Sequence, residues 1–206
     1  MTVEGVKALA DVVPKHLHAL VVFMAGTGVR LGEALGVTLT DLDLDRRDVR
    51  VHRQLRRSDH ALAPLKTART GVRERTLPLP AHLVFHLRTH LDTYGPGPDG
   101  LLWRGERNGM LRHDSAIRAF ANAAKATDQA GRSAVDLRHH YASTLAANGV
   151  DVFKIAQALG HTTPRLVIAT YGHLVPDGGT QVRRVMDAAW SVVTDVSPGS
   201  SRLTAF

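Results

Sequence analysis

The stretch VDLRHHYASTLAANGVDVFKIAQALGHTTPRLVIATY, residues 135–171, decides how the rest of the chain is interpreted. Its pattern predicts three short helices, over residues 135–147, 152–159 and 164–171. The stretch also carries Arg138, His161 in a Leu-Gly-His corner, and Tyr171. Arginine, histidine and tyrosine on separate short helices of a basic chain predict a phosphate-binding pocket with a nucleophile at its edge.

The composition of the chain limits the kinds of partner it can bind and the kinds of reaction it can catalyse. The 206 residues include 26 Lys and Arg against 19 Asp and Glu, a formal net charge of +7. This excess favours a polyanionic partner, with nucleic acid ahead of an anionic membrane surface. The absence of cysteine excludes disulfides, cysteine-ligated zinc and thiol nucleophiles. We find no signal peptide and no apolar run of about 18 residues, which predicts a cytoplasmic protein without a membrane span.

The periodicity predicts an α+β fold that is mostly helical, with a small three-stranded antiparallel sheet. Residues 16–25 are apolar on most faces, so we expect a buried helix ended by Gly26 and Gly28. Alternating residues predict the three strands, at 49–55, 62–65 and 74–79. The loop before the last strand is expected to carry four basic residues: Lys66, Arg69, Arg73 and Arg75. Further helices are expected over residues 3–13, 30–35, 81–93, 113–127 and 180–193.

Five separated segments, taken in order, resemble the catalytic domain of the tyrosine recombinase (phage integrase) family. They are GTGVRLGEALGV at 26–37, LKTARTGVRERTLPLP at 65–80, DLRHHYAS at 136–143, ALGHTTP at 158–164 and ATYGHL at 169–174. The resemblance spans roughly residues 2–190, and the ordered set is far more specific than any one segment.

The resemblance implies a site-specific recombinase or integrase that cleaves and rejoins DNA through a 3′-phosphotyrosyl intermediate, without metal or cofactor. Tyr171 would attack the scissile phosphate and release a 5′ hydroxyl. Arg30 and Arg138 would bind the phosphate oxygens, because a guanidinium stays charged and offers paired donors. Lys66 would protonate the 5′ leaving oxygen, since lysine can give up a proton.

Two further residues have supporting places in this resemblance. His161 would donate to a non-bridging oxygen, and Glu33, one helical turn beyond Arg30, would buttress a neighbouring group. Tyr141 is interpreted as a core or DNA-facing residue, and His113 as the start of a helix. The 12 histidines raise the possibility of zinc, but adjacent histidines on one helix diverge and no HExxH motif is present.

One position departs from the family pattern. The second-arginine segment usually reads His-x-x-Arg, and Val135 stands where that histidine is expected. Losing one preorganised donor typically costs about 100- to 1,000-fold in rate. We therefore expect a slower or conditionally active enzyme unless His139 or His140 takes the vacant place, and a Val135→His variant that forms more phosphotyrosine on a suicide DNA substrate.

Two other functions fit the same residues. A type IB topoisomerase-like enzyme shares the chemistry but relaxes supercoils without exchanging partners, and a catalytically impaired relative binds DNA without cutting it. A covalent adduct that is lost in Tyr171→Phe excludes the second.

The expected organisation is a catalytic domain over residues 1–195 and a flexible tail over 196–206, without the separate N-terminal core-binding domain usual in the family. Residues 180–193 present apolar side chains at helical spacing. They are expected to pack on a neighbouring protomer, as a homo-oligomer on double-stranded DNA, or back on their own chain.

Overall fold

The structure is a computed structural model that describes residues 1–65, 74–176 and 178–191. It divides into two compact units, Met1–Val175 and Pro176–Phe206. The predicted Lys66, Arg69 and Arg73 lie outside the described residues, as does the expected C-terminal tail.

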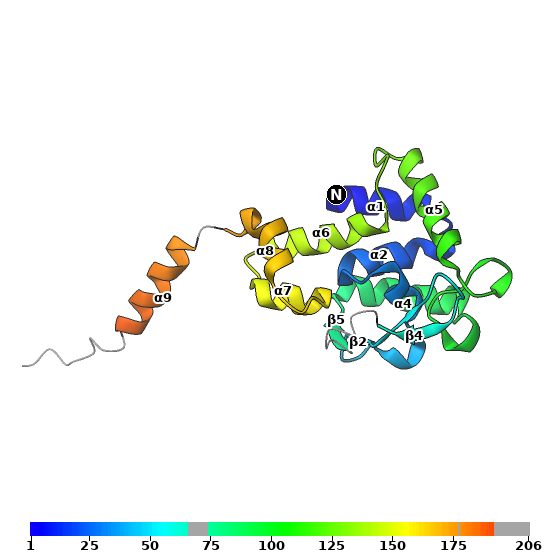
Figure 1. Cartoon of the computed structure of the whole chain (residues 1–206), viewed down its shortest axis with the longest axis horizontal. Helices are drawn as coiled ribbons and strands as arrows, with labels where there is room; N and C mark the ends of the chain where they lie inside the picture. The colour runs from blue at the N-terminus through cyan, green and yellow to red at the C-terminus, as the bar shows by residue number, and fades with distance from the viewer. Residues whose placement is uncertain (66–73, 177, 192–206) are drawn as a thin grey trace, which may run out of the picture. The chain divides into compact units, whose positions relative to one another are not determined.

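Unit 1 is mainly helical, as predicted (Figure 1). Its helices are α1 (Val3–Val12), α2 (His18–Thr27), α3 (Leu31–Leu35), α4 (Ala81–Tyr94), α5 (His113–Ala126), α6 (Ala134–Ala147), α7 (Val152–Leu159) and α8 (Arg165–Tyr171). Short 3-10 turns lie between or after them, at Lys15–Leu17, Leu39–Asp41, Pro98–Gly100, Glu106–Asn108 and Gly172–Leu174. In unit 2, α9 covers Gly179–Ser191.

Helix α2 is the buried centre of unit 1. Leu20, Phe23 and Met24 are fully buried because the helix is apolar on nearly all sides. The prediction that Gly26 helps to end this helix is wrong, since α2 continues through it to Thr27. Gly28 alone ends the helix, in the left-handed conformation at φ 66°, and its N–H donates to the Met24 carbonyl over 2.9 Å.

The three-stranded antiparallel sheet is present, but its strands differ from the predicted set. It has the order β1 (Leu42–Asp43), β2 (Asp48–Val51) and β5 (Arg75–Pro78). The predicted long strand divides at His52, and its second half, β3 (Arg53–Leu55), pairs with β4 (Leu62–Pro64) as a separate hairpin. Periodicity along one run does not reveal such a change of partner, because both halves keep an extended backbone.

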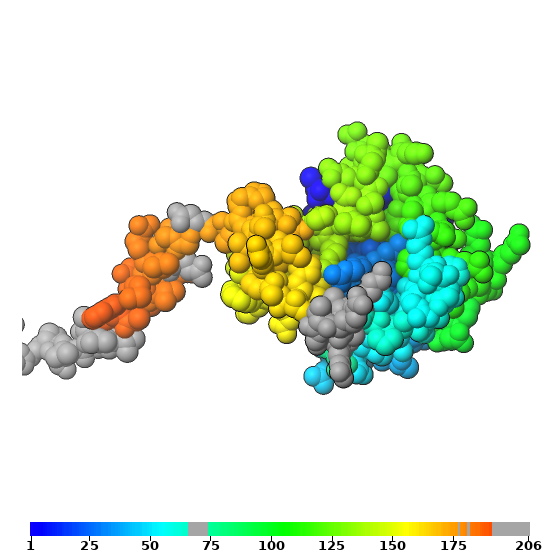
Figure 2. All heavy atoms as spheres, viewed as in Figure 1, coloured from blue at the N-terminus to red at the C-terminus, as the bar shows by residue number. Residues whose placement is uncertain are grey.

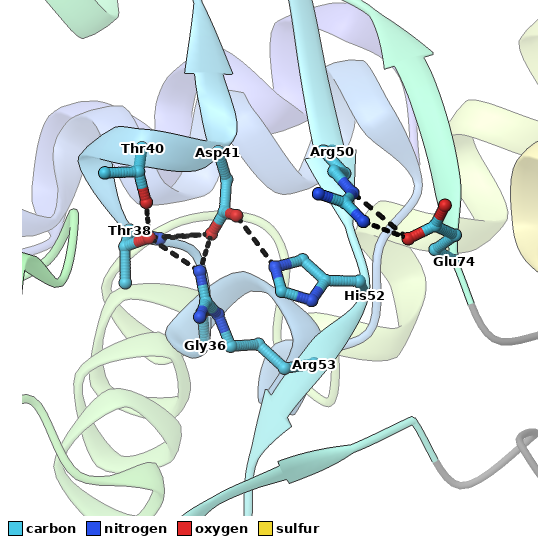
Figure 3. Close-up of polar contacts among 8 residues, drawn as sticks. All are labelled: Gly36, Thr38, Thr40, Asp41, Arg50, His52, Arg53 and Glu74. Atoms are coloured by element: carbon cyan, nitrogen blue, oxygen red, sulfur yellow. Dashed lines mark hydrogen bonds and ion pairs between the residues drawn. The ribbon is translucent and has the colours of Figure 1, made fainter.

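The division at His52 is fixed by a buried carboxylate (Figure 3). The Asp41 side chain accepts hydrogen bonds from the Thr38 backbone N–H at 2.8 Å and from Arg53 Nη2 at 2.6 Å. The His52 ring nitrogen Nε2 lies 2.9 Å from its other oxygen. Arg53 also donates to the Gly36 carbonyl, so the β3–β4 hairpin is tied to the end of α3.

Unit 1 has a main core and a smaller second cluster. The second cluster joins α6, α7 and α8, and its buried members include Ala142, Ile155, Leu159, Val167 and Tyr171. Figure 1 shows α6 running from the body of unit 1 to α7 and α8. Helix α6 therefore belongs to both cores. One face of α6 packs against α2, and another face packs against α8.

Candidate active site

Arg138 is the most constrained side chain of the site. On α6, it donates from Nη1 to the Gly28 carbonyl over 2.7 Å and from Nη2 to the Leu159 carbonyl over 2.6 Å. These carbonyls are free because they stand at the ends of α2 and α7, where no further helical N–H reaches them. Burial, together with nearby Arg30, lowers the pKa of Arg138 to about 10, so the guanidinium stays charged at neutral pH.

His161 follows directly on the left-handed Gly160 that ends α7. Its Nε2 lies 3.0 Å from Arg138 Nη2. Because a guanidinium can only donate, this Nε2 accepts and the ring proton belongs on Nδ1. Burial and then Arg138 lower the pKa of His161 to about 4, which leaves the imidazole neutral at pH 7.

Arg30 caps α3 and is linked to the buried Glu33. The Arg30 backbone N–H and its Nη1 each donate to a Glu33 carboxylate oxygen, both over 3.0 Å. The Arg30 side chain remains 42% exposed, whereas that of Glu33 is 3% exposed. The exposed guanidinium can therefore contact a bound anion while the Glu33 carboxylate fixes the Arg30 backbone and one of its side-chain nitrogens.

Arg75 completes this carboxylate's environment and was missed as a site residue by the sequence reasoning. Its Nη2 donates to Glu33 over 2.6 Å, and its Nε donates to the Ala158 carbonyl over 2.7 Å. Burial alone would raise the pKa of Glu33, but Arg75 and Arg30 outweigh it and the pKa lies below the ordinary value. One buried arginine thus joins β5 to both α3 and the end of α7.

Arg75 falls in two overlapping predictions, of which the basic loop is wrong and the strand over residues 74–79 is confirmed. It is the first residue of β5, and its side chain is 4% exposed. The strand alternates buried and exposed residues, and Arg75 has the same parity as buried Leu77. This alternation could have predicted that Arg75 is buried. An arginine on the apolar face of a strand needs a partner inside the protein.

Tyr171 ends α8 with its ring in the second core, at 8% exposure. Its hydroxyl lies 2.5 Å from Nδ1 of His139 on α6. Burial raises the pKa of Tyr171, and Arg138 opposes that rise only in part. The hydroxyl is therefore protonated at neutral pH.

The two histidines after Arg138 differ in direction. His139 is directed to Tyr171, whereas His140 Nδ1 lies 3.0 Å from the Met1 carbonyl. Tyr141 is half-buried and its ring lies against Gly28, where an added Cβ would come within 2.4 Å of a ring carbon. Gly28 is thus needed both for its backbone conformation and for this close approach.

Val135 lies on the surface near Arg30. Its side chain is 60% exposed, and it lines a cleft of about 650 Å³ together with Arg30. Figure 2 shows this face hollowed, with blue atoms of the α2–α3 region between the green-to-yellow α6 and the cyan hairpin. The structure thus brings together Arg30, Glu33, Arg138 and His161, with His139 and Tyr171 alongside; the predicted Lys66 lies outside the described residues.

Residues 1–65, 74–176 and 178–191 contain neither a grouped metal site nor a membrane-spanning helix. No three His, Asp or Glu side chains among them are grouped so as to hold a metal ion. None of the described helices combines the length and apolarity needed to cross a membrane.

Sequence comparison places these residues among known proteins. Residues 1–177 match the Phage integrase family. The chain is 24% identical to a tyrosine recombinase XerC-like protein of Caldanaerobacter subterraneus subsp. tengcongensis, over 84% of this chain and 50% of that protein. It is 27% identical to a putative prophage phiRv2 integrase of Mycobacterium tuberculosis, over 79% of this chain and 44% of that protein. The chain therefore spans about half the length of these curated relatives.

Solved structures share the fold. The Tn1549 transposon integrase, in complex with a circular intermediate DNA, superimposes with a TM-score of 0.71 at 18% identity, covering 91% of this chain and 65% of that one. The catalytic domain of bacteriophage HP1 integrase gives a TM-score of 0.59 at 19% identity, covering 97% and 98% of the two chains. With the family match over residues 1–177, these findings confirm the resemblance read from the sequence: the chain belongs to the phage integrase family.

Proposed function

We propose that this chain cleaves and rejoins DNA strands as the catalytic domain of a tyrosine site-specific recombinase or integrase. The observation that carries the proposal is the position of the Tyr171 hydroxyl. It lies 2.5 Å from His139 Nδ1 and near enough to Arg138 for that guanidinium to oppose the rise in the Tyr171 pKa. Family membership supports it, as do relatives named as recombinases and integrases and a structural neighbour bound to DNA.

The phosphate would bind between the arginines. Arg138 is fixed by two backbone carbonyls, and Arg30 is fixed through Glu33 while its guanidinium stays exposed. Charges positioned before the substrate arrives need no reorganisation when negative charge develops on the phosphoryl oxygens. His161 would hold Arg138 in place through the contact at Nε2. Donation to a non-bridging oxygen would require the His161 ring to turn, because Nδ1, which carries the proton, is buried.

Tyr171 would attack the phosphorus and form a 3′-phosphotyrosyl ester. The P–O5′ bond breaks, and the leaving oxygen takes a proton that we assign to Lys66. Attack by a 5′ hydroxyl on the ester reverses these steps, and a hydroxyl from a second DNA would complete strand exchange. The formal net charge of +7 supports DNA as the partner.

A half-site DNA with a nick beside the scissile phosphate tests the proposal, because loss of the short leaving strand traps the covalent adduct. We expect the wild-type chain to form an adduct resistant to denaturant, and Tyr171→Phe to form none while still binding the DNA. Tyr94→Phe on α4 is the matched control and should react normally. Adduct formation by Tyr171→Phe at the wild-type rate would remove the proposed nucleophile.

We also propose that α9 joins protomers on DNA. Its Val182, Val185 and Met186 side chains are each at least half exposed and recur at helical spacing. An apolar helix face of this kind is suited to a groove on a second copy of the chain. A Val182→Glu, Val185→Glu variant should lose higher-order complexes with two DNA sites in a gel-shift assay but retain half-site cleavage; unchanged complexes would contradict the role of α9.

A further inference from the structure

Helix α6 carries a histidine one turn away from Val135, the position where the family pattern has a histidine and this chain does not. Val135 and His139 are four residues apart on this helix, and residues at that spacing share a face. The His139 side chain is exposed, yet its Nδ1 reaches the Tyr171 hydroxyl at 2.5 Å. The ring centroids are 6.0 Å apart at an interplanar angle of 54°, so the contact is made by the hydroxyl and not by stacking.

Tyr171 needs a proton acceptor to react. Burial raises the pKa of its hydroxyl, so the phenolate is rare at neutral pH. The only proton on that oxygen can be directed to a ring nitrogen within hydrogen-bond distance. His139 Nδ1 meets that geometric requirement for a general base.

The other described candidates near the site are committed elsewhere. His161 Nε2 faces Arg138, and its pKa of about 4 makes it a poor acceptor at neutral pH. His140 faces the Met1 carbonyl, and the arginines cannot accept a proton. Glu33 is held by Arg30 and Arg75.

We propose that His139 is the general base that activates Tyr171, in a position one helical turn beyond the missing histidine. This inference rests on the proposed strand-cleavage function. It also gives one of the two histidines expected to take the place left at Val135, His139, a definite role on the nucleophile.

The step balances without any further reactant. The Tyr171 hydroxyl proton moves to His139 Nδ1 as the phenolic oxygen forms its bond to phosphorus and the P–O5′ bond breaks. The 5′ oxygen receives its proton from the separate general acid. In the reverse direction His139 returns the proton to the tyrosine oxygen as the 5′ hydroxyl attacks; because the ring is exposed, it can also exchange that proton with water.

The test compares His139→Asn with His140→Asn on the nicked half-site. An asparagine amide can place its oxygen near the position of Nδ1 and keep the hydrogen bond, but it cannot take the proton. We expect His139→Asn to slow adduct formation by about 100-fold or more, with unchanged DNA affinity and melting temperature, and His140→Asn to react at close to the wild-type rate. A wild-type rate for His139→Asn would overturn the proposal and leave His139 a positioning contact at most.

A second substrate separates the base from the acid. Replacing the bridging 5′ oxygen by sulfur gives a leaving group that needs no proton, so a defect in the general acid is relieved and one in the base is not. The His139→Asn defect should persist on the sulfur substrate, and His139→Gln should behave in the same way. Relief by sulfur would overturn the assignment, whereas adduct formation by Tyr171→Phe would instead sink the proposed function itself.

Discussion

Two parts of the site are built in different ways. The arginine–histidine cluster, which consists of Arg30, Glu33, Arg75, Arg138 and His161, is tied to backbone carbonyls at the ends of α2 and α7 and to a buried carboxylate. The nucleophile pair, His139 and Tyr171, is joined by one hydrogen bond between the Tyr171 hydroxyl and Nδ1 of the exposed His139.

The two parts of the site therefore contribute differently to the stability of the fold and to the rate of the reaction. Folding itself assembles the phosphate-binding cluster, because its side chains satisfy helix ends and a buried charge that would otherwise lack partners. The nucleophile pair contributes little to the fold through its polar contact. Substitutions in the cluster should therefore affect both stability and rate, and substitution of His139 should affect rate alone.

The largest effect is expected at Arg138. Lysine keeps the charge but cannot donate to the Gly28 carbonyl, the Leu159 carbonyl and a phosphate at once. Arg138→Lys should slow adduct formation by about 100- to 1,000-fold, measured in single-turnover reactions on the nicked half-site. Arg88→Lys, at an exposed pair with Asp45, is the control; equal rates for the two variants would contradict a preorganised Arg138.

Arg75 and Glu74, neighbours at the start of β5, allow a buried and an exposed ion pair to be compared by their effect on the free energy of unfolding. Arg75 is buried against Glu33, while Glu74 pairs with Arg50 on the surface. Arg75→Leu leaves a buried carboxylate without its main partner and should lower the free energy of unfolding by about 3 kcal/mol or more. Glu74→Gln should change it little. Urea denaturation measures both, and similar losses would show that burial of Arg75 is not what stabilises the site.

Substitution of Val135 is expected to have a smaller effect, an increase in the cleavage rate. A histidine there could donate toward the cleft that Arg30 also lines, but His139 already serves Tyr171. Val135→His should therefore raise the cleavage rate by less than about tenfold, below the full value of a missing oxyanion donor. Val135→Asn tests whether any donor suffices. No gain with histidine would show that this position lacks a role in the rate.

The smallest expected effect is on the pH dependence of the free energy of unfolding. The pKa of His161 falls from 6.5 to about 4 on folding, so the unfolded chain binds more protons between these values. Its contribution to stability is present above about pH 6.5 and is lost as the pH falls toward 4. His161→Asn should make the unfolding free energy decline less steeply over this window. Parallel wild-type and variant curves would contradict a neutral, half-buried His161.

The sequence predicted most helices because their apolar spacing and end residues are local signals. The helices predicted over residues 135–147 and 152–159 correspond to α6 and α7, so Arg138 lies on a helix and His161 follows one. The change of strand partners at His52 was not predictable, because Asp41 fixes it from another element.

The site was predictable as a set of residues but not as a set of contacts. The motifs singled out Arg30, Arg138, His161 and Tyr171, and these residues lie near one another in the structure. They did not show that Arg75 joins Glu33 to the end of α7, or that His139 meets Tyr171, since both contacts connect residues more than 30 positions apart. Such pairs depend on how the helices pack, which one-dimensional patterns do not contain.

Peptide mapping of the trapped DNA adduct tests the central claim most directly. The chain has three tyrosines, Tyr94, Tyr141 and Tyr171, so proteolysis and mass spectrometry can assign the modified one without ambiguity. We predict a nucleotide attached through phosphate to Tyr171 alone. A nucleotide on Tyr94 or Tyr141, or on a residue other than tyrosine, would contradict it.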